Sequence, residues 1–180
     1  QTDGNKILFI TDPEQWYIKR FRASTGLIWR PKLFITHTFT SEYNQNEVAD
    51  TIAQLNPNFF LNGRRKQRHL SLIYNFSVDR LDIRPYPLQG WRATFELRQN
   101  GFIPAEDLHL TRIYAEYDRY YKFTPKLSLA IVTAGRMSLP RRRPPYYNNQ
   151  GLGYGNNFVR GYEYYVADGL DFVIAKTSFH

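Results

Sequence analysis

Trp91-Arg92-Ala93-Thr94-Phe95-Glu96-Leu97-Arg98 is the stretch that decides the fold class, because apolar and polar side chains alternate along it without a break. Successive side chains of a β-strand point to opposite faces, so this stretch predicts a strand with one apolar face and one polar face. An apolar face that carries tryptophan and phenylalanine is covered either by a protein core or by lipid. The rest of the chain indicates which of the two it is.

Six other segments are predicted to be strands, each with roughly ten core residues. In residues 69–78, Leu70 and Leu72 lie on one predicted face of the strand, and His69 and Ser71 lie on the other. The remaining segments are residues 16–29, 33–43, 108–121, 126–136 and 170–179. Strands of this length cross an outer membrane at a tilt, so the sequence predicts an all-β, antiparallel sheet of about seven membrane strands.

The predicted connections between these strands differ strongly in length. Turns are expected at residues 30–32, 79–91 and 122–125, of which the first and the last are short. Loops are expected at residues 44–63, 100–107 and 137–169, of which the first and the last are long. In the first loop Val48, Ile52 and Leu55 have the spacing of a short helix. Leu108 and Leu110 lie on the same predicted strand face as the charged residues of their segment, which predicts a bulge or a strand end. Short turns on one side and long loops on the other are typical of a membrane barrel.

The composition of the 180 residues favours lipid over a soluble core. Aromatic residues make up 17% of the chain, which nevertheless contains no run of 18 apolar residues, so a helical membrane protein is excluded. The net charge of +8 is compatible with two anionic partners, phosphorylated lipid head groups and nucleic acid. There are no cysteines, and the histidines have no ligand spacing, so neither a metal site nor a cofactor is expected. The histidines are His37, His69, His109 and His180.

The last long loop contains Asn156-Asn157-Phe158-Val159-Arg160-Gly161-Tyr162-Glu163, preceded by three glycines. A segment so rich in glycine and asparagine predicts a tightly bent backbone rather than regular structure. The Val-Arg-Gly-Tyr tetrad resembles the loop signature of the outer-membrane assembly-factor superfamily, the BamA/TamA and bacterial surface antigen barrels. The proline-containing turn at residues 79–91, closed by Gly90, resembles a turn that these barrels carry before a strand.

The resemblance implies part of a transmembrane β-barrel, about seven strands of a sixteen-stranded one, in the outer membrane of a Gram-negative bacterium. Residues 1–180 would form a single barrel domain that is incomplete at both ends. The signature, Val159, Arg160, Gly161 and Tyr162, would be anchored in the lumen, with Phe158, Tyr164 and Tyr165 packing the loop against the wall. An arginine buried there needs carboxylate or carbonyl partners. The resemblance implies that the acidic partner of Arg160 lies on a strand after this loop, which this chain lacks. Among the residues present, Glu96, Glu116 and Asp118 would face the lumen and are candidate acidic partners.

Two further groups of charged residues have both ordinary and functional interpretations. The basic residues Arg141, Arg142 and Arg143, together with Arg64 and Arg65, are either solvated charges or contacts for lipopolysaccharide phosphates. The lumen carboxylates are expected to form salt bridges with Arg92, Arg98 and Arg112. No nucleophile, histidine and carboxylate set accompanies them, so no catalytic residues are expected.

Three functional classes are compatible with the sequence. The first is a non-enzymatic barrel that assists insertion or translocation of client outer-membrane or secreted proteins, with accessory assembly lipoproteins as further partners. The second is a barrel that anchors an N-terminally fused lipase or phosphoesterase. The third is a soluble basic β-barrel binding module. Nucleic-acid readers place aromatic rings beside lysine and arginine on one exposed face. In this chain the aromatic residues lie on the same strand face as leucine and valine. This favours contact with lipid, and nucleic acid is not expected as a partner.

Overall fold

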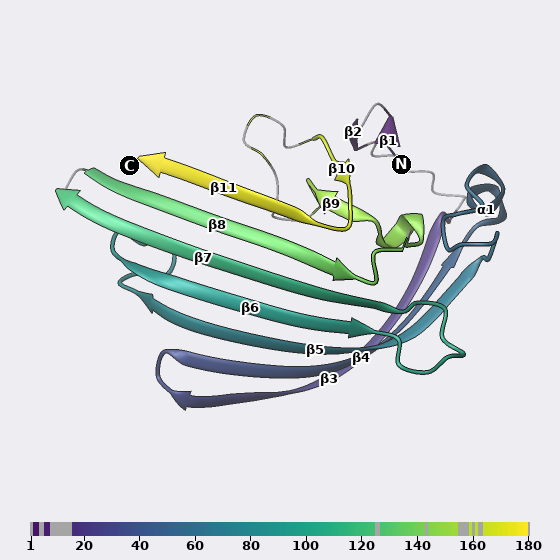
Figure 1. The fold of residues 1–180 in the computed structure, drawn as a ribbon, viewed down its shortest axis with the longest axis horizontal. Helices are drawn as coiled ribbons and strands as arrows, with labels where there is room; N and C mark the ends of the chain where they lie inside the picture. The colour runs from purple at the N-terminus through teal and green to yellow at the C-terminus, as the bar shows by residue number, and fades with distance from the viewer. Residues whose placement is uncertain are drawn as a thin grey trace.

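The computed structural model describes residues 2–3, 6–7, 16–124, 127–142, 144–154, 159, 161 and 164–179. Most of this chain forms one seven-stranded antiparallel sheet with the order β11-β8-β7-β6-β5-β4-β3, so neighbours in the sheet follow one another along the chain (Figure 1). Its strands are β3 (Ile18–Lys32), β4 (Ile35–Val48), β5 (Lys66–Leu81), β6 (Gly90–Asn100), β7 (Leu110–Thr124), β8 (Leu127–Leu139) and β11 (Phe172–Phe179). The seven predicted strands are confirmed.

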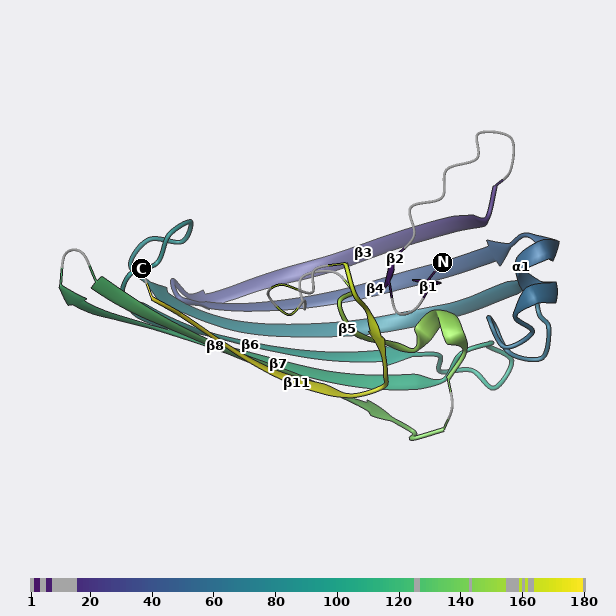
Figure 2. The ribbon, with the colours of Figure 1, turned by 90° about the horizontal axis from the view of Figure 1, so that it is seen from above.

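The sheet is curved into an open trough and is not closed (Figures 1 and 2). The turns β3–β4, β5–β6 and β7–β8 lie at one end of the trough, called here the turn end. At the opposite end, called the loop end, lie the helix α1 (Asp50–Leu55), residues 101–109 and the start of the long connection from β8 to β11. The arrangement is that of part of an antiparallel transmembrane barrel.

The remaining elements are short. β1 (Thr2–Asp3) pairs with β2 (Lys6–Ile7), and the connection from β8 to β11 contains the 3-10 helix η1 (Tyr146–Asn148) and two strands that pair with each other, β9 (Gln150–Leu152) and β10 (Ala167–Asp168). Within the described part of the chain, no helix is long and apolar enough to cross a membrane.

The two faces of the sheet differ as the alternation predicts. On β5, the side chains of Gln67, His69 and Ser71 are buried on the concave face, whereas Leu72 on the convex face is 47% exposed. Exposed apolar side chains continue across the convex face from β3 to β11. They include Leu27, Phe39, Leu72, Leu97, Tyr117 and Val173. No described segment covers them, as expected of a surface that faces lipid.

The prediction of a turn at residues 30–32 is wrong. β3 continues to Lys32, which pairs with Ile35, and the chain reverses at Leu33 and Phe34. Pro31 is tolerated inside β3 because the register shifts between Trp29 and Lys32, so regular pairing with β4 is interrupted at this position. The turn expected at 122–125 is also displaced, since β7 includes Thr124.

The turn between β5 and β6 occupies less of the chain than predicted, because β5 runs to Leu81 and β6 begins at Gly90. The side chain of Asp82 organises it, accepting hydrogen bonds from the backbone N–H groups of Ile83 (2.8 Å) and Leu88 (3.1 Å). Gly90 has a φ of 115°, and a Cβ there would lie 2.1 Å from the carbonyl oxygen of Arg80. Only glycine fits where this turn re-enters the sheet.

Strand ends at the loop end also differ from the prediction. β4 extends through Val48, because Asn44 and Asn46 point to the concave face and do not interrupt pairing. The helix is correspondingly short and excludes Val48. β7 begins at Leu110 without a register shift against β6, so Leu108 precedes the strand and marks a strand end rather than a bulge.

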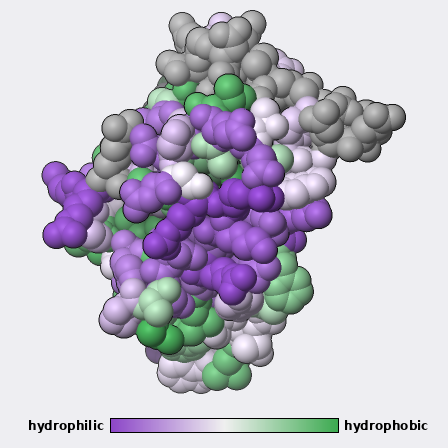
Figure 3. Space-filling model, turned by 90° about the vertical axis from the view of Figure 1, so that its right-hand side faces the viewer, coloured by the Kyte–Doolittle hydropathy of each residue, from purple (hydrophilic) through white to green (hydrophobic). Residues whose placement is uncertain are grey.

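The loop end has a largely hydrophilic surface (Figure 3). This contrasts with the apolar convex face, and it is expected where strands emerge from a membrane into water.

We predict that residues 1–180 expressed alone do not form a stable soluble monomer. Among the described residues no strand pairs with the outer edges of β3 and β11, and the convex face exposes apolar side chains. Refolding into buffer, followed by circular dichroism melting and size exclusion, is expected to yield aggregate. A soluble monomer with a cooperative melting transition would contradict this account of the edges.

Candidate functional site

The candidate site is the connection from β8 to β11, whose base is folded onto the concave face of the sheet. β9 and β10 pair only because glycines allow their backbones to approach closely. A Cβ on Gly151 would lie 2.3 Å from the carbonyl oxygen of Ala167, and one on Gly153 would lie 2.2 Å from that of Tyr165. Gly153 also has a φ of 85°. The glycines noticed in the sequence thus build the neck of the loop.

Arg136, on the concave face of β8, is the main contact between this loop and the sheet. Its Nη2 donates to the carbonyl oxygens of Gln150 and, at 3.3 Å, of Gly169, while its Nε donates to that of Leu170 at 3.3 Å. The guanidinium carbon also lies 5.0 Å from the centre of the Phe172 ring. One side chain therefore joins both sides of the loop neck and the first residue of β11.

Neighbouring concave side chains add to this anchorage. The Ser138 hydroxyl donates to the carbonyl of Leu170 at 2.8 Å, and the Ser138 N–H donates to the Asp171 carboxylate at 2.7 Å. Arg112 on β7 donates to the carbonyl of Asn148 at 2.5 Å, and Gln67 on β5 donates to the Asn148 side chain at 3.0 Å. The loop base is thus bound to three strands, β5, β7 and β8.

The two arginines explain why the loop stays on the wall. In the part of the chain that the structure describes, no carboxylate lies within 4 Å of the guanidinium of Arg112 or Arg136. Partly buried guanidinium groups need acceptors, and here loop carbonyls supply them to Arg136 and to the Nη2 of Arg112. Each hydrogen bond of this charged kind contributes about 1.5–3 kcal/mol. The exposed pair of Arg141 and Asp171 contributes at most about 1 kcal/mol, so it cannot replace them.

A second contact holds the loop base from the loop end. The segment after α1 accepts two backbone hydrogen bonds, from Tyr146 N–H to the Asn58 carbonyl (3.0 Å) and from Tyr147 N–H to the Phe59 carbonyl (3.2 Å). Phe60, which is 1% exposed, packs edge-on against the ring of Tyr147 at 5.6 Å. The loop that contains α1 and the loop that follows β8 therefore form one packed cap.

The inner wall also carries the predicted carboxylates, already paired with arginines. Arg92 donates to Asp118 at 2.9 Å and lies 3.3 Å from Glu116, and Arg98 lies 3.3 Å from Glu96. Arg98 also reaches Glu42, at 3.5 Å. The prediction of a salt bridge for Arg112 is wrong, because its guanidinium donates to the carbonyl oxygen of Asn148 instead.

The signature residues are only partly described. Val159 is exposed, and Gly161 has a φ of 85°, whereas Phe158, Arg160 and Tyr162 lie outside the described residues. The side chains of Tyr164 and Tyr165, which are expected to pack against the wall, are 65% and 43% exposed. Asp118 is the wall carboxylate with spare acceptor capacity, since its buried Oδ1 has no hydrogen-bond partner among the residues that the structure describes.

The basic residues considered for lipopolysaccharide lie at the loop end, and most have carboxylate partners. Arg64 contacts Asp107, Arg65 lies 2.8 Å from Asp50, and Arg141 lies 3.6 Å from Asp171. Arg142 is exposed, and Arg143 is outside the described residues. These cations are therefore partly neutralised by the chain itself.

The loop of residues 101–109 supports β5 beyond the end of β6. The carboxylate of Glu106 accepts from the N–H groups of Leu70 (2.7 Å) and Ile103 (3.0 Å), and that of Asp107 accepts from Arg68 N–H at 2.9 Å. Desolvation would raise the pKa of Glu106, but the backbone hydrogen bonds outweigh it, so the pKa is lowered and the group stays charged.

Sequence reasoning missed Arg136, Ser138 and Gln67 as loop contacts. A signal was present for Arg136, since it is the one charged side chain on a β8 face otherwise made of small residues and Val132. A long cation beside small side chains indicates that another segment fills the space.

We predict that Gly153→Ala opens the neck of the loop. Its Cβ would collide with the Tyr165 carbonyl, so β9 and β10 should no longer pair. Limited proteolysis of the intact protein should then cleave residues 153–166 faster than in the wild type. Gly63→Ala is the matched control, because Gly63 also has a positive φ (66°) but nothing within 4 Å of its Cβ position. Equal cleavage of the two variants would contradict the close approach.

Comparison with known proteins agrees with this geometry. A model of the Omp85 superfamily domain matches residues 11–169, which is most of the chain. A search of curated proteins found no match. Members of this superfamily are outer-membrane proteins of Gram-negative bacteria that insert or translocate other proteins, which accounts for an apolar convex face and a charged concave one. With the match extending from β3 into the loop that Arg136 holds, the chain belongs to the Omp85 superfamily.

Proposed function

We propose that this chain is part of an outer-membrane barrel of the BamA/TamA type. Such a barrel assists insertion or translocation of client proteins without making or breaking covalent bonds. The observation that carries the proposal is the base of the signature loop, held on the concave wall by Arg112 and Arg136. Residues 1–180 contribute one barrel domain, and the loop end faces the outside of the cell.

In this proposal the loop acts as an internal brace. Arg112 and Arg136 hold its base against β7 and β8, and the tip then lies along the inner wall, where Arg160 meets a carboxylate. Among the described wall carboxylates we choose Asp118 as the partner, because its Oδ1 is buried and has acceptor capacity that Arg92 does not use. A braced wall keeps these strands rigid while a client strand pairs with an open barrel edge elsewhere.

The apolar convex face supports the membrane barrel over a soluble basic module. Its exposed leucine, phenylalanine and valine side chains extend from β3 to β11, whereas a soluble module would bury them. An enzyme fused upstream would use the same barrel as an anchor, and no described residue of this chain favours that alternative.

The test substitutes the arginines that hold the loop. It uses the intact protein in cells that depend on that protein. Arg136→Gln and Arg160→Ala should each weaken the heat-modifiable folded band and lower the amounts of other outer-membrane barrels, because the loop is released. Arg119→Gln is the matched control, since that arginine lies on the convex face and stacks on Tyr121 at 4.9 Å.

Two results would contradict the proposal. If Arg136→Gln leaves the folded band and the other barrels unchanged, the loop base is not a functional brace. If the folded band weakens while other barrels stay constant, the protein serves a single secreted client or an attached enzyme rather than general assembly.

A further inference from the structure

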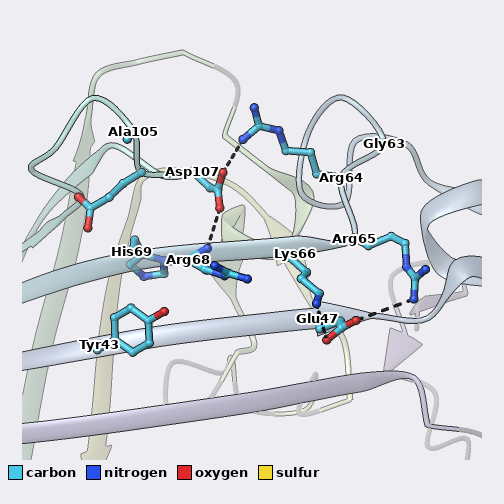
Figure 4. Close-up of a pocket in the computed structure, with 11 residues that line it drawn as sticks. Tyr43, Glu47, Gly63, Arg64, Arg65, Lys66, Arg68, His69, Ala105 and Asp107 are labelled. Carbon is cyan, nitrogen blue, oxygen red and sulfur yellow. Dashed lines mark hydrogen bonds and ion pairs between the residues drawn. The ribbon is translucent and has the colours of Figure 1, made fainter.

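A hollow of about 830 Å³ opens on the sheet at the loop end, between β4, β5 and residues 101–109 (Figure 4). Tyr43, Glu47, Lys66 and Arg68 line it from the convex side of β4 and β5, and Arg64 and Asp107 close it from the loops. Lys66 and Arg68 are two residues apart on one strand, so their side chains point to the same side. The hollow therefore presents cations outward, toward the membrane surface.

The carboxylates around this hollow are largely committed to other groups. Glu106 accepts backbone N–H groups, Asp107 accepts from Arg64 and from the Arg68 backbone, and Glu47 is shared by Lys66 (3.6 Å) and Arg65 (3.8 Å). No carboxylate that the structure describes lies within 4 Å of the Arg68 guanidinium. Arg68, with Lys66 beside it, is thus left to bind an anion from outside the chain.

A second, apolar hollow of about 620 Å³ lies next to the first, toward the turn end of the same face. Its walls include Leu27, Phe39, Leu72, Leu97 and Phe102. It exists because Thr25 and Ser41, which are register partners, are small, while the next residues on that face of β4 are Phe39 and Tyr43. A dip of this kind in a lipid-facing wall fits a hydrocarbon chain.

The spacing of the two hollows matches a lipid. Arg68 in the first and Leu72 in the second are four residues apart on β5, about 13 Å at the usual rise of a strand. Tyr43 lies between them, at the level where aromatic residues mark a membrane interface. Cations stand at the water side and apolar walls at the hydrocarbon side, in the order of a lipid head group and its acyl chain.

We propose that the outer wall over β3–β6 binds one lipopolysaccharide molecule, with a lipid A phosphate on Arg68 and Lys66 and an acyl chain in the groove at Ser41. Bidentate and charge-assisted contacts make arginine and lysine suitable for a phosphate. The site lies on the opposite face of the sheet from the loop brace. It depends on the loop end facing outside, not on which client the barrel handles, so the two proposals fail separately.

The test uses the intact protein purified in detergent, with bound lipid counted by native mass spectrometry. The probes are diphosphorylated lipid A, its dephosphorylated form, phosphatidylglycerol and inorganic phosphate as a competitor. K66Q/R68Q should weaken lipid A binding about tenfold or more, since two charged hydrogen-bond donors are lost. Ser41→Phe, which fills the groove, should weaken it too, while inorganic phosphate at moderate concentration should not displace the lipid.

The matched control is R141Q/R142Q, which removes two exposed cations from the loop end away from the hollow. It should bind lipid A as the wild type does, and all variants should show wild-type heat-modifiable migration. The proposal is overturned if K66Q/R68Q binds as tightly as the wild type, or if R141Q/R142Q is the variant that loses the lipid. Equal binding of dephosphorylated lipid A or phosphatidylglycerol would overturn the phosphate or the lipopolysaccharide assignment. Full displacement by inorganic phosphate would indicate a free-anion site.

Discussion

The contact of the Arg136 guanidinium with the carbonyls of Gln150, Gly169 and Leu170 is the constraint on which the loop arrangement depends. A guanidinium on the inner wall needs acceptors, and the backbone of a loop folded inward needs donors. The Arg136 guanidinium and the loop carbonyls therefore satisfy each other. If the loop moved away, the guanidinium donors and the carbonyl acceptors would both lose their hydrogen-bond partners. Glycines at 151 and 153 make the neck narrow enough for a single side chain to reach both of its sides.

Strand alternation separates two chemistries on one sheet. The concave face holds ion pairs such as Arg92 with Asp118, in a lumen where polar contacts are shielded from hydrocarbon. The convex face is largely apolar along its middle, and at the loop end it carries the cations Lys66 and Arg68. The brace and the lipid site therefore lie on opposite faces of β5, and substitutions can address one without the other.

The sequence was sufficient for the seven strands, because alternation is a local property that each segment carries by itself. It was insufficient for strand ends: Asn44 and Asn46 resemble loop residues, yet they point into the lumen, and Pro31 resembles a turn residue, yet it lies inside β3, where the register shifts. The loop contacts were less accessible still. Charge pairing predicts a carboxylate partner for Arg112, whereas the structure gives it the carbonyl of Asn148. Only the fold brings residues from β5, β7 and β8 to one loop.

The most direct test of this account is thiol cross-linking of the loop base to the inner wall. The chain has no cysteines, so a pair is introduced at Gln67 and Asn148, whose Nε2 and Oδ1 atoms are 3.0 Å apart. Cysteine is shorter than either side chain, so the two thiols are bridged by a short bis-thiol-reactive reagent rather than by a direct disulfide. A pair at Ser71 and Asn100, register partners on β5 and β6, serves as the positive control. The account predicts that both pairs cross-link in the intact protein in its membrane. Cross-linking of the control pair without the Gln67–Asn148 pair would contradict a loop fixed on the wall.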